Sequence, residues 1–276
     1  MTKAAYLSAS PYWDFNQQAT VWKGRIVDEK LFAMMMGKIT TLNDYMRSVG
    51  LWNAIWLAAT FILISSKYAK DMIMLMLGIF ACMATSITPL LGPCCCSTPW
   101  DGPAMFFATL IFFAWSFGRI WQLILAIALG SIFKESLCIF AIILLFFYQK
   151  IHIRHRILFV LECAALCIIA RMIITSIALG HIQLNTSEMV HTDGLAIVDH
   201  IKQLFHWQHS FLFVNAGLMF VILFTKNTIG FYDTGIKSII ALFWIGQLIG
   251  GGEPDEGREY LELIPMIVIY LKEKYV

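Results

Sequence analysis

Charged residues are scarce in this chain. Only 14% of its 276 residues are Asp, Glu, Lys or Arg, whereas 59% are hydrophobic and the mean hydropathy is +0.72. Soluble domains carry about 25% charged residues, so this composition excludes an ordinary soluble globular domain. The formal net charge of +2 is too small to indicate binding to nucleic acid, and we expect no such partner.

Metal-binding and secretory patterns are also missing. Residues 94–96 are three consecutive cysteines, but they have no nearby histidines at the spacing of a zinc site. Residues 1–15 contain no apolar stretch like that of a signal peptide. Four other cysteines lie inside apolar blocks, where free cysteine behaves as a small hydrophobe: Cys82, Cys138, Cys163 and Cys167. The cysteines are therefore expected to be structural.

What the sequence does contain is a series of apolar blocks of about 12 to 20 residues. They predict an all-α fold, a polytopic transmembrane helical bundle of about nine spans in the cell membrane. The predicted spans are residues 50–66, 72–91, 103–118, 120–133, 136–148, 157–179, 210–225, 236–249 and 261–271. Residues 1–48 are the predicted extramembrane segment, and residues 49–276 form one transmembrane domain with an outer loop at 180–209.

One boundary among these spans has two interpretations. Lys134 and Glu135 interrupt an apolar stretch that covers residues 120–148. The charged pair indicates either a tight re-entrant turn or the junction of two short spans, and we favour two spans. A block of 12 to 14 residues extends only about 20 Å, whereas the hydrocarbon core is about 30 Å thick. The short spans must therefore borrow flanking residues, tilt, or penetrate partly.

Basic residues predict the orientation of the bundle. One set of alternate loops carries Lys67, Lys70, Arg119, Lys150, Arg154, Arg156, Lys226, Lys237, Lys272 and Lys274, and this set should be cytoplasmic. The opposite loops are rich in acids and should face outward. This pattern also puts residues 1–48 outside, although that segment contains six basic residues and no apolar block that would carry it across.

Ionisable groups at membrane depth or at the outer face are the candidates for function, because placing charge there costs several kcal/mol without partners. Asp14 lies among aromatic residues, which is also the composition of an interfacial aromatic belt. Asp101 precedes Pro103 at the start of a span, where helix capping alone would explain it. Lys134 and Glu135 are adjacent and would neutralise one another in the simplest case.

Two further candidates involve arginine. Residues 250–260 begin with three consecutive glycines and carry several charges, including Glu256 and Arg258, and an arginine at the entrance of a span is a good ligand for phosphate. Arg171 lies inside the sixth apolar block, nine residues from Glu162 and so on the opposite helix face. Arg171 therefore needs another acid, a carbonyl group or an anionic ligand as its partner.

The order of these segments resembles that in the GT-C superfamily of polytopic glycosyltransferases, which use polyprenyl-phosphate sugars. Residues 14–19 with Gly24 resemble the first outer loop of that superfamily, where an acid precedes a short helix. Residues 100–103 followed by a Phe-rich span, and then residues 134–136, are similar to the middle of such enzymes. Residues 256–258 followed by Pro265 resemble their late acidic-Arg-Pro stretch.

The resemblance implies transfer of a sugar from a lipid-linked phosphate donor to an acceptor hydroxyl at the outer membrane face. Asp14 would be the general base. Arg258, with Arg171 or Lys134, would stabilise the departing lipid phosphate. Asp101 or Glu135 would orient the acceptor or a divalent metal, and Glu256 would contribute to substrate binding. The implied partners are membrane lipid and a polyprenyl-phosphate sugar.

The chain departs from that superfamily at both ends, and two other functions stay open. No apolar span precedes the first outer loop and no large soluble domain follows the last span, so we expect a truncated or reduced member. A transporter or flippase for a lipid-linked or anionic substrate would line its pathway with the same charges. A non-catalytic membrane scaffold is the third alternative, and it predicts no effect of replacing Asp14 or Arg258.

Overall fold

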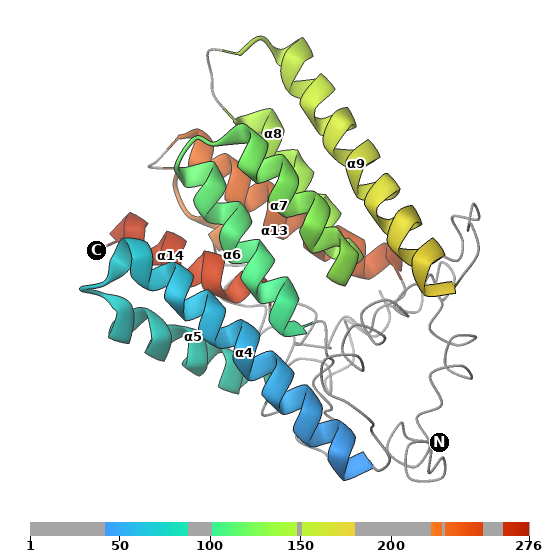
Figure 1. Cartoon of the computed structure of the whole chain (residues 1–276). Helices are drawn as coiled ribbons and strands as arrows, with labels where there is room; N and C mark the ends of the chain where they lie inside the picture. The colour runs from blue at the N-terminus through green and yellow to red at the C-terminus, as the bar shows by residue number, and fades with distance from the viewer. Residues whose placement is uncertain are drawn as a thin grey trace.

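In this computed structural model, residues 42–87, 101–147, 151–179, 222–227, 230–250 and 262–275 are described. All regular structure within these ranges is helical, which confirms the predicted all-α class (Figure 1). The elements are α4 (Leu42–Tyr68), α5 (Met72–Ile87), α6 (Asp101–Ser116), α7 (Ile120–Phe133), η2 (Glu135–Ile142), α8 (Ile143–Phe146), α9 (Ile153–Leu179), α13 (Phe231–Gly250) and α14 (Ile264–Tyr275).

Seven of the nine predicted apolar blocks overlap one α-helix each, although α4 begins eight residues before its block. The block at residues 136–148 is not one α-helix, because η2 is a 3-10 helix of 8 residues and α8 adds only 4. The block at 210–225 is described only from residue 222 onward, and most of the two predicted loops at 1–48 and 180–209 lies outside the described residues. Over the ranges described here, no helix is both long enough and apolar enough to cross a membrane.

Helix α6 is the centre of the described bundle. Thirteen of its 16 residues are buried, and it packs against α4, α7 and α14. Close packing needs small residues at the crossings. An added Cβ at Gly130 of α7 would lie 2.9 Å from the Cβ of Phe107, so α6 and α7 approach as closely as a glycine allows.

The contacts define two ends of the bundle. Helices α4, α6 and α14 run in the same direction, because Gly102 meets Asn53 near their starts and Lys67 meets Ser116 and Glu273 near their ends. We call the end of the bundle where α6 and α14 begin the Lys134 end, because Lys134, between α7 and η2, lies there. The opposite end, where α14 finishes, is the Lys274 end. In Figure 1 the C-terminus marks the Lys274 end.

The chain reverses direction at Lys134. This residue has extended backbone angles of φ −145° and ψ 121°, so it cannot continue α7, and η2 then packs back against α7. The predicted interruption of the 120–148 stretch is therefore present. Its second half is irregular because residues 135–142 adopt the tighter 3-10 geometry, in which long runs are uncommon.

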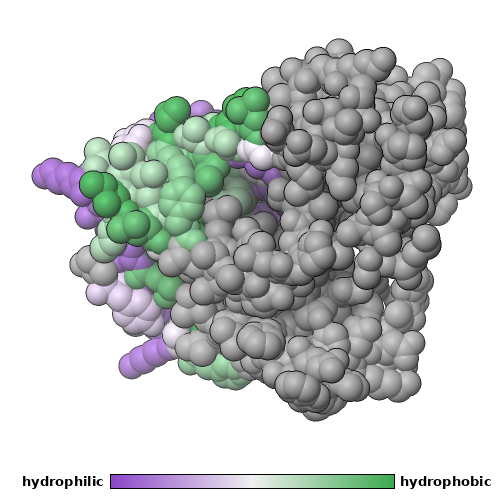
Figure 2. Space-filling view, turned by 90° about the horizontal axis from the view of Figure 1, so that it is seen from below, coloured by the Kyte–Doolittle hydropathy of each residue, from purple (hydrophilic) through white to green (hydrophobic). Residues whose placement is uncertain are grey.

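Large apolar side chains cover the outward faces of several helices. On α7 the exposed residues Trp121, Leu125 and Leu129 recur at a spacing of four. On α9 the outward face carries exposed residues along much of its length: Ile153, Ile157, Leu158, Leu161, Leu166, Ile168, Ile169 and Ile173. Helices α5 and α9 lie on opposite flanks in Figure 1, and Figure 2 shows hydrophobic residues over much of the described part of one face. Such contiguous apolar surface marks a membrane or protein contact.

Candidate functional site

Three charged side chains meet in the interior at the Lys134 end. The Nζ atom of Lys134 lies 2.8 Å from Oε2 of Glu262 and 4.0 Å from Oδ1 of Asp101. The three side chains are 3%, 1% and 5% exposed, so this is a buried ionic cluster. Buried charges of this kind cost several kcal/mol to desolvate and persist only when they are paired, which makes them informative about function.

Each member of the cluster comes from a different part of the chain. Asp101 is the first residue of α6, where the positive end of the helix dipole favours a carboxylate. Lys134 occupies the reversal between α7 and η2, and Glu262 precedes α14. Ser136 of η2 donates its hydroxyl hydrogen to Oε1 of Glu262 at 2.6 Å, so both oxygens of that carboxylate have partners. The cluster thus joins three helical segments.

A close backbone contact fixes the Asp101 side of the cluster. The amide of Gly102 donates to Oδ1 of Asn53 at 3.0 Å, and this bond satisfies one of the free amides at the start of α6. A Cβ at Gly102 would lie 2.7 Å from that oxygen and 3.0 Å from the Asn53 Cα. Only glycine permits this approach of α6 to α4, which is what positions the adjacent Asp101.

Arg171 is buried and contacts backbone carbonyl groups. Its Nη1 atom donates to the carbonyl oxygens of Ser131 at 2.8 Å and Ile132 at 3.2 Å. These carbonyls belong to the last turn of α7, where intrahelical partners run out. A carbonyl was one of the three expected partners of Arg171. The guanidinium therefore holds the end of α7 just before Lys134, while Glu162 is exposed on the other face of α9.

The structure brings together some of the predicted site residues and leaves others undescribed. Asp101 and Lys134 are in one cluster, and Arg171 contacts the backbone two and three residues before Lys134. Glu135 begins η2, but its side chain is not described. The remaining candidates lie outside the described residues: Asp14, Glu256 and Arg258.

Glu262 is the member of this cluster that the sequence analysis missed. It lies three residues before Pro265, inside the predicted span 261–271, and it was not singled out as an acid in an apolar block. The criterion that selected Arg171 would have selected it. Asp233 was missed for a different reason, because it stands three residues before the predicted span 236–249, yet it is fully buried.

A metal ion has little support from the described residues. Within them, no three His, Cys, Asp or Glu side chains lie close enough together to hold a metal ion. The carboxylates of Asp101 and Glu262 share an ammonium group instead, and a divalent cation would have to displace it. The divalent metal named in the sequence analysis stays a prediction.

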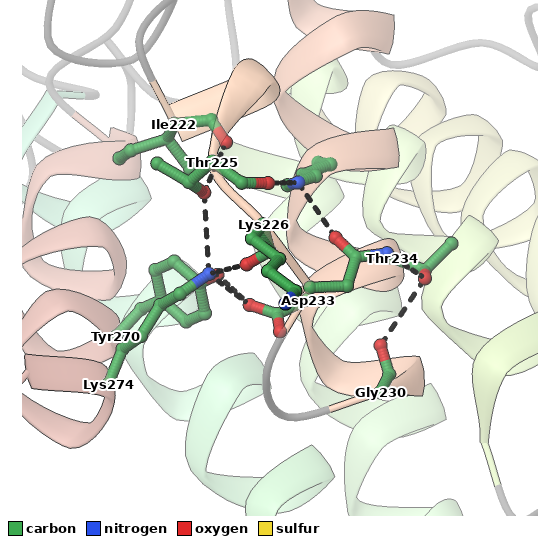
Figure 3. A network of polar contacts seen from close by, with 10 residues as sticks. Ile222, Thr225, Lys226, Gly230, Asp233, Thr234, Tyr270 and Lys274 are labelled. Carbon is green, nitrogen blue, oxygen red and sulfur yellow. Dashed lines mark hydrogen bonds and ion pairs between the residues drawn. The ribbon is translucent and has the colours of Figure 1, made fainter.

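A second polar network occupies the Lys274 end (Figure 3). Lys274 Nζ lies 2.8 Å from Oδ1 of Asp233, whose side chain is fully buried, and it also donates to Tyr270, Thr225 and the carbonyl of Lys226. Tyr270 donates to Asp233 as well. Nearby, Lys237 donates to the Asn227 side chain at 2.7 Å. This network ties α14 to α13 and to residues 222–227.

Comparison with protein-family models, with curated proteins and with solved structures finds no match to this chain.

Proposed function

We propose that this chain is a multi-pass membrane glycosyltransferase that moves a sugar from a lipid-linked phosphate donor to an acceptor hydroxyl at the Lys134 end. The observation that carries the proposal is the meeting of segments that are far apart in the sequence. Asp101 and Lys134 come from the two middle segments of the GT-C resemblance, and Glu262 follows its last segment, residues 256–258, by four residues. A shared substrate site is a reason for these segments to converge.

Residence in a membrane is part of the proposal. Its support is the 59% hydrophobic composition together with the apolar outward faces of α4, α5, α7 and α9, while the charged clusters are turned inward. That distribution suits a lipid solvent. Helices α5, α6 and α7 have 16, 16 and 14 residues, which is about 21–24 Å, so the proposed nine-span bundle needs flanking residues or a locally thinner bilayer.

The proposed reaction breaks the bond between the anomeric carbon and the phosphate oxygen and forms a bond from that carbon to the acceptor oxygen. The acceptor proton passes to a carboxylate, for which Asp14 is our candidate. The phosphate leaves with the electron pair of the broken bond, and Lys134 with Arg258 would stabilise its charge. Hydroxyl groups of the sugar or the acceptor would donate hydrogen bonds to the remaining acids, which are Asp101, Glu135, Glu256 and Glu262.

The test is sugar transfer by membranes that contain the chain. A panel of radiolabelled polyprenyl-phosphate sugars would be supplied with membrane acceptors, and label in product would be compared among wild type, Asp14→Asn, Lys134→Gln and Arg258→Ala at matched protein levels. The control is Glu162→Gln, because Glu162 is exposed on α9. We expect transfer to be lost in the three variants and kept in the control.

Two results would reject this function. Transfer that survives all three substitutions would remove the proposed site residues from the reaction. Movement of labelled lipid across proteoliposomes without any new glycosidic bond would support the transporter alternative, in which the buried charges line a pathway.

A further inference from the structure

We infer that the α6–α7 turn at the Lys274 end binds the headgroup of an anionic phospholipid. The site is centred on Phe117, which is 51% exposed and lies between two cations. The Nζ atom of Lys67 is 5.3 Å from the ring centroid of Phe117, and the Cζ atom of Arg119 is 5.5 Å from it. This inference rests on the membrane residence proposed above and is independent of the proposed reaction.

The geometry of the turn presents these groups together. Gly118 has φ +67°, a left-handed conformation that glycine adopts without strain, and it joins Phe117 to Arg119, the residue before α7. Lys67 reaches the same ring from the last turn of α4 and also donates to Ser116 at 3.4 Å. Two cations from different helices therefore flank one exposed aromatic ring.

The local charge favours an anion. The turn and the neighbouring helix ends carry four basic residues and two acids, so their formal net charge is +2. These residues are Lys67, Lys70, Arg119, Lys272, Asp71 and Glu273. Glu273 pairs with Lys67 at 3.0 Å, and Asp71 pairs with Lys272. Arg119 donates a hydrogen bond to the neutral side chain of Gln122 at 3.2 Å, and this contact leaves the positive charge of Arg119 in place.

A lipid rather than free phosphate is indicated by the surface that continues from the turn. Along α7 the exposed fractions are 67% at Trp121, 58% at Leu125 and 42% at Leu129, and their spacing of four puts them on one stripe. The stripe begins within one turn of Arg119. An anionic headgroup at Lys67 and Arg119 would leave its acyl chains along this stripe, with Trp121 at the level where aromatic rings meet the headgroups.

The test is a lipid titration of the full-length protein. The purified chain in a neutral detergent would be titrated with phosphatidylglycerol or phosphatidylcholine, and bound lipids would be counted by native mass spectrometry. Each basic residue near an anionic headgroup contributes about 1 kcal/mol, a factor of about five. We therefore expect Lys67→Gln/Arg119→Gln to weaken phosphatidylglycerol binding by between about fivefold and 25-fold. The matched control is Arg154→Gln, an exposed basic residue on α9, and it should bind as wild type does.

The inference is overturned if phosphatidylglycerol binds no better than phosphatidylcholine, or if the Arg154 control loses as much affinity as the double variant. Displacement of the lipid by millimolar inorganic phosphate would also overturn it, because the site would then be one for free phosphate. Sugar transfer measured on the same preparations separates the two proposals. Loss of lipid preference with transfer retained rejects only the lipid site, whereas release of the chain from membranes by alkaline carbonate rejects membrane residence itself.

Discussion

Buried charged side chains are paired differently at the two ends of the bundle. At the Lys134 end, Lys134 lies between two acids, and the trio has one more negative than positive charge. At the Lys274 end, Lys274 faces one acid, Asp233, and further hydrogen bonds from tyrosine, threonine and backbone complete the network. The first arrangement brings together charged side chains from three separate segments, two of which, Asp101 and Lys134, were candidates from the sequence, whereas the second joins one ion pair to tyrosine, threonine and backbone groups. The comparison makes the Lys134 end the better candidate for substrate binding.

The largest expected effect is loss of Lys134. Replacing it with Met leaves Asp101 and Glu262 without the cation they share, and breaking a buried pair in this way costs about 3–5 kcal/mol. Lys274→Met should cost less, because it removes the cation from one acid, Asp233, rather than from two, and Asp233 keeps its hydrogen bond from Tyr270. Chemical denaturation in detergent, followed by circular dichroism, measures both. Equal losses at the two ends would contradict the difference described above.

A double substitution sharpens the same comparison. The double variant Lys134→Met/Glu262→Gln has one unpaired buried acid fewer than Lys134→Met, so the double variant should be the more stable of the two. The unfolding free energies of the single and double variants give the coupling energy between the two positions. A coupling energy near zero would show that the 2.8 Å ion pair does not stabilise the fold.

Arg171 should have the next largest effect. Arg171→Met removes the charged donor that holds the carbonyls of Ser131 and Ile132, and such hydrogen bonds contribute about 1.5–3 kcal/mol. Because these carbonyls precede Lys134, the substitution should also disturb the Lys134 cluster. In the transfer assay we expect a larger fall in kcat than rise in KM. Leu166→Met, at an exposed position on α9, is the control.

A substitution at Gly102 tests whether α4 and α6 must approach this closely. Gly102→Ala places a Cβ 3.0 Å from the Asn53 backbone, which cannot move without shifting α4, so we expect a loss of about 1–3 kcal/mol. Gly50 in α4 has no atom within 4 Å of its Cβ position. Gly50→Ala should therefore be neutral or stabilising by up to about 1 kcal/mol, through helix propensity. The melting temperature should fall for Gly102→Ala and should not fall for Gly50→Ala.

The smallest expected effect is a loss of stability when groups at the Lys274 end lose their protons at high pH. Burial lowers the pKa of Lys274, but its hydrogen bonds to Asp233 and Tyr270 outweigh burial, so the pKa lies above its ordinary value of 10.5. Burial and the hydrogen bond to Glu273 likewise raise the pKa of Tyr68 above 10.0.

Both raised pKa values have the same sign for stability. The folded state holds these protons more tightly than the unfolded state, so their contribution is complete below about pH 10 and is lost as the pH rises through the folded values. We expect the melting temperature to fall between pH 10 and 12, and the Tyr68→Phe variant to fall less steeply than wild type. A melting temperature that does not change across this range would contradict the assignment.

The sequence predicted the helical class and most helix positions because long apolar blocks leave few alternatives to helices. It also predicted that the chain is interrupted at Lys134, since a charge is unlike its apolar neighbours. It did not predict the 3-10 geometry of residues 135–142, which depends on packing against α7 and α13. Asp101 and Lys134 were recognised one at a time, but their meeting with Glu262 requires the tertiary arrangement of α6, α7 and α14.

The Arg171 contact has a consequence for how the chain would enter a bilayer. Arg171 donates to the carbonyls of Ser131 and Ile132, which lie 40 and 39 positions earlier in the chain. Alone in lipid, α9 would expose a guanidinium group to hydrocarbon, and α7 would end in unsatisfied carbonyls. For the membrane residence proposed above, the two helices would therefore leave the translocon as a pair, with the intervening hairpin retained until α9 has been synthesised.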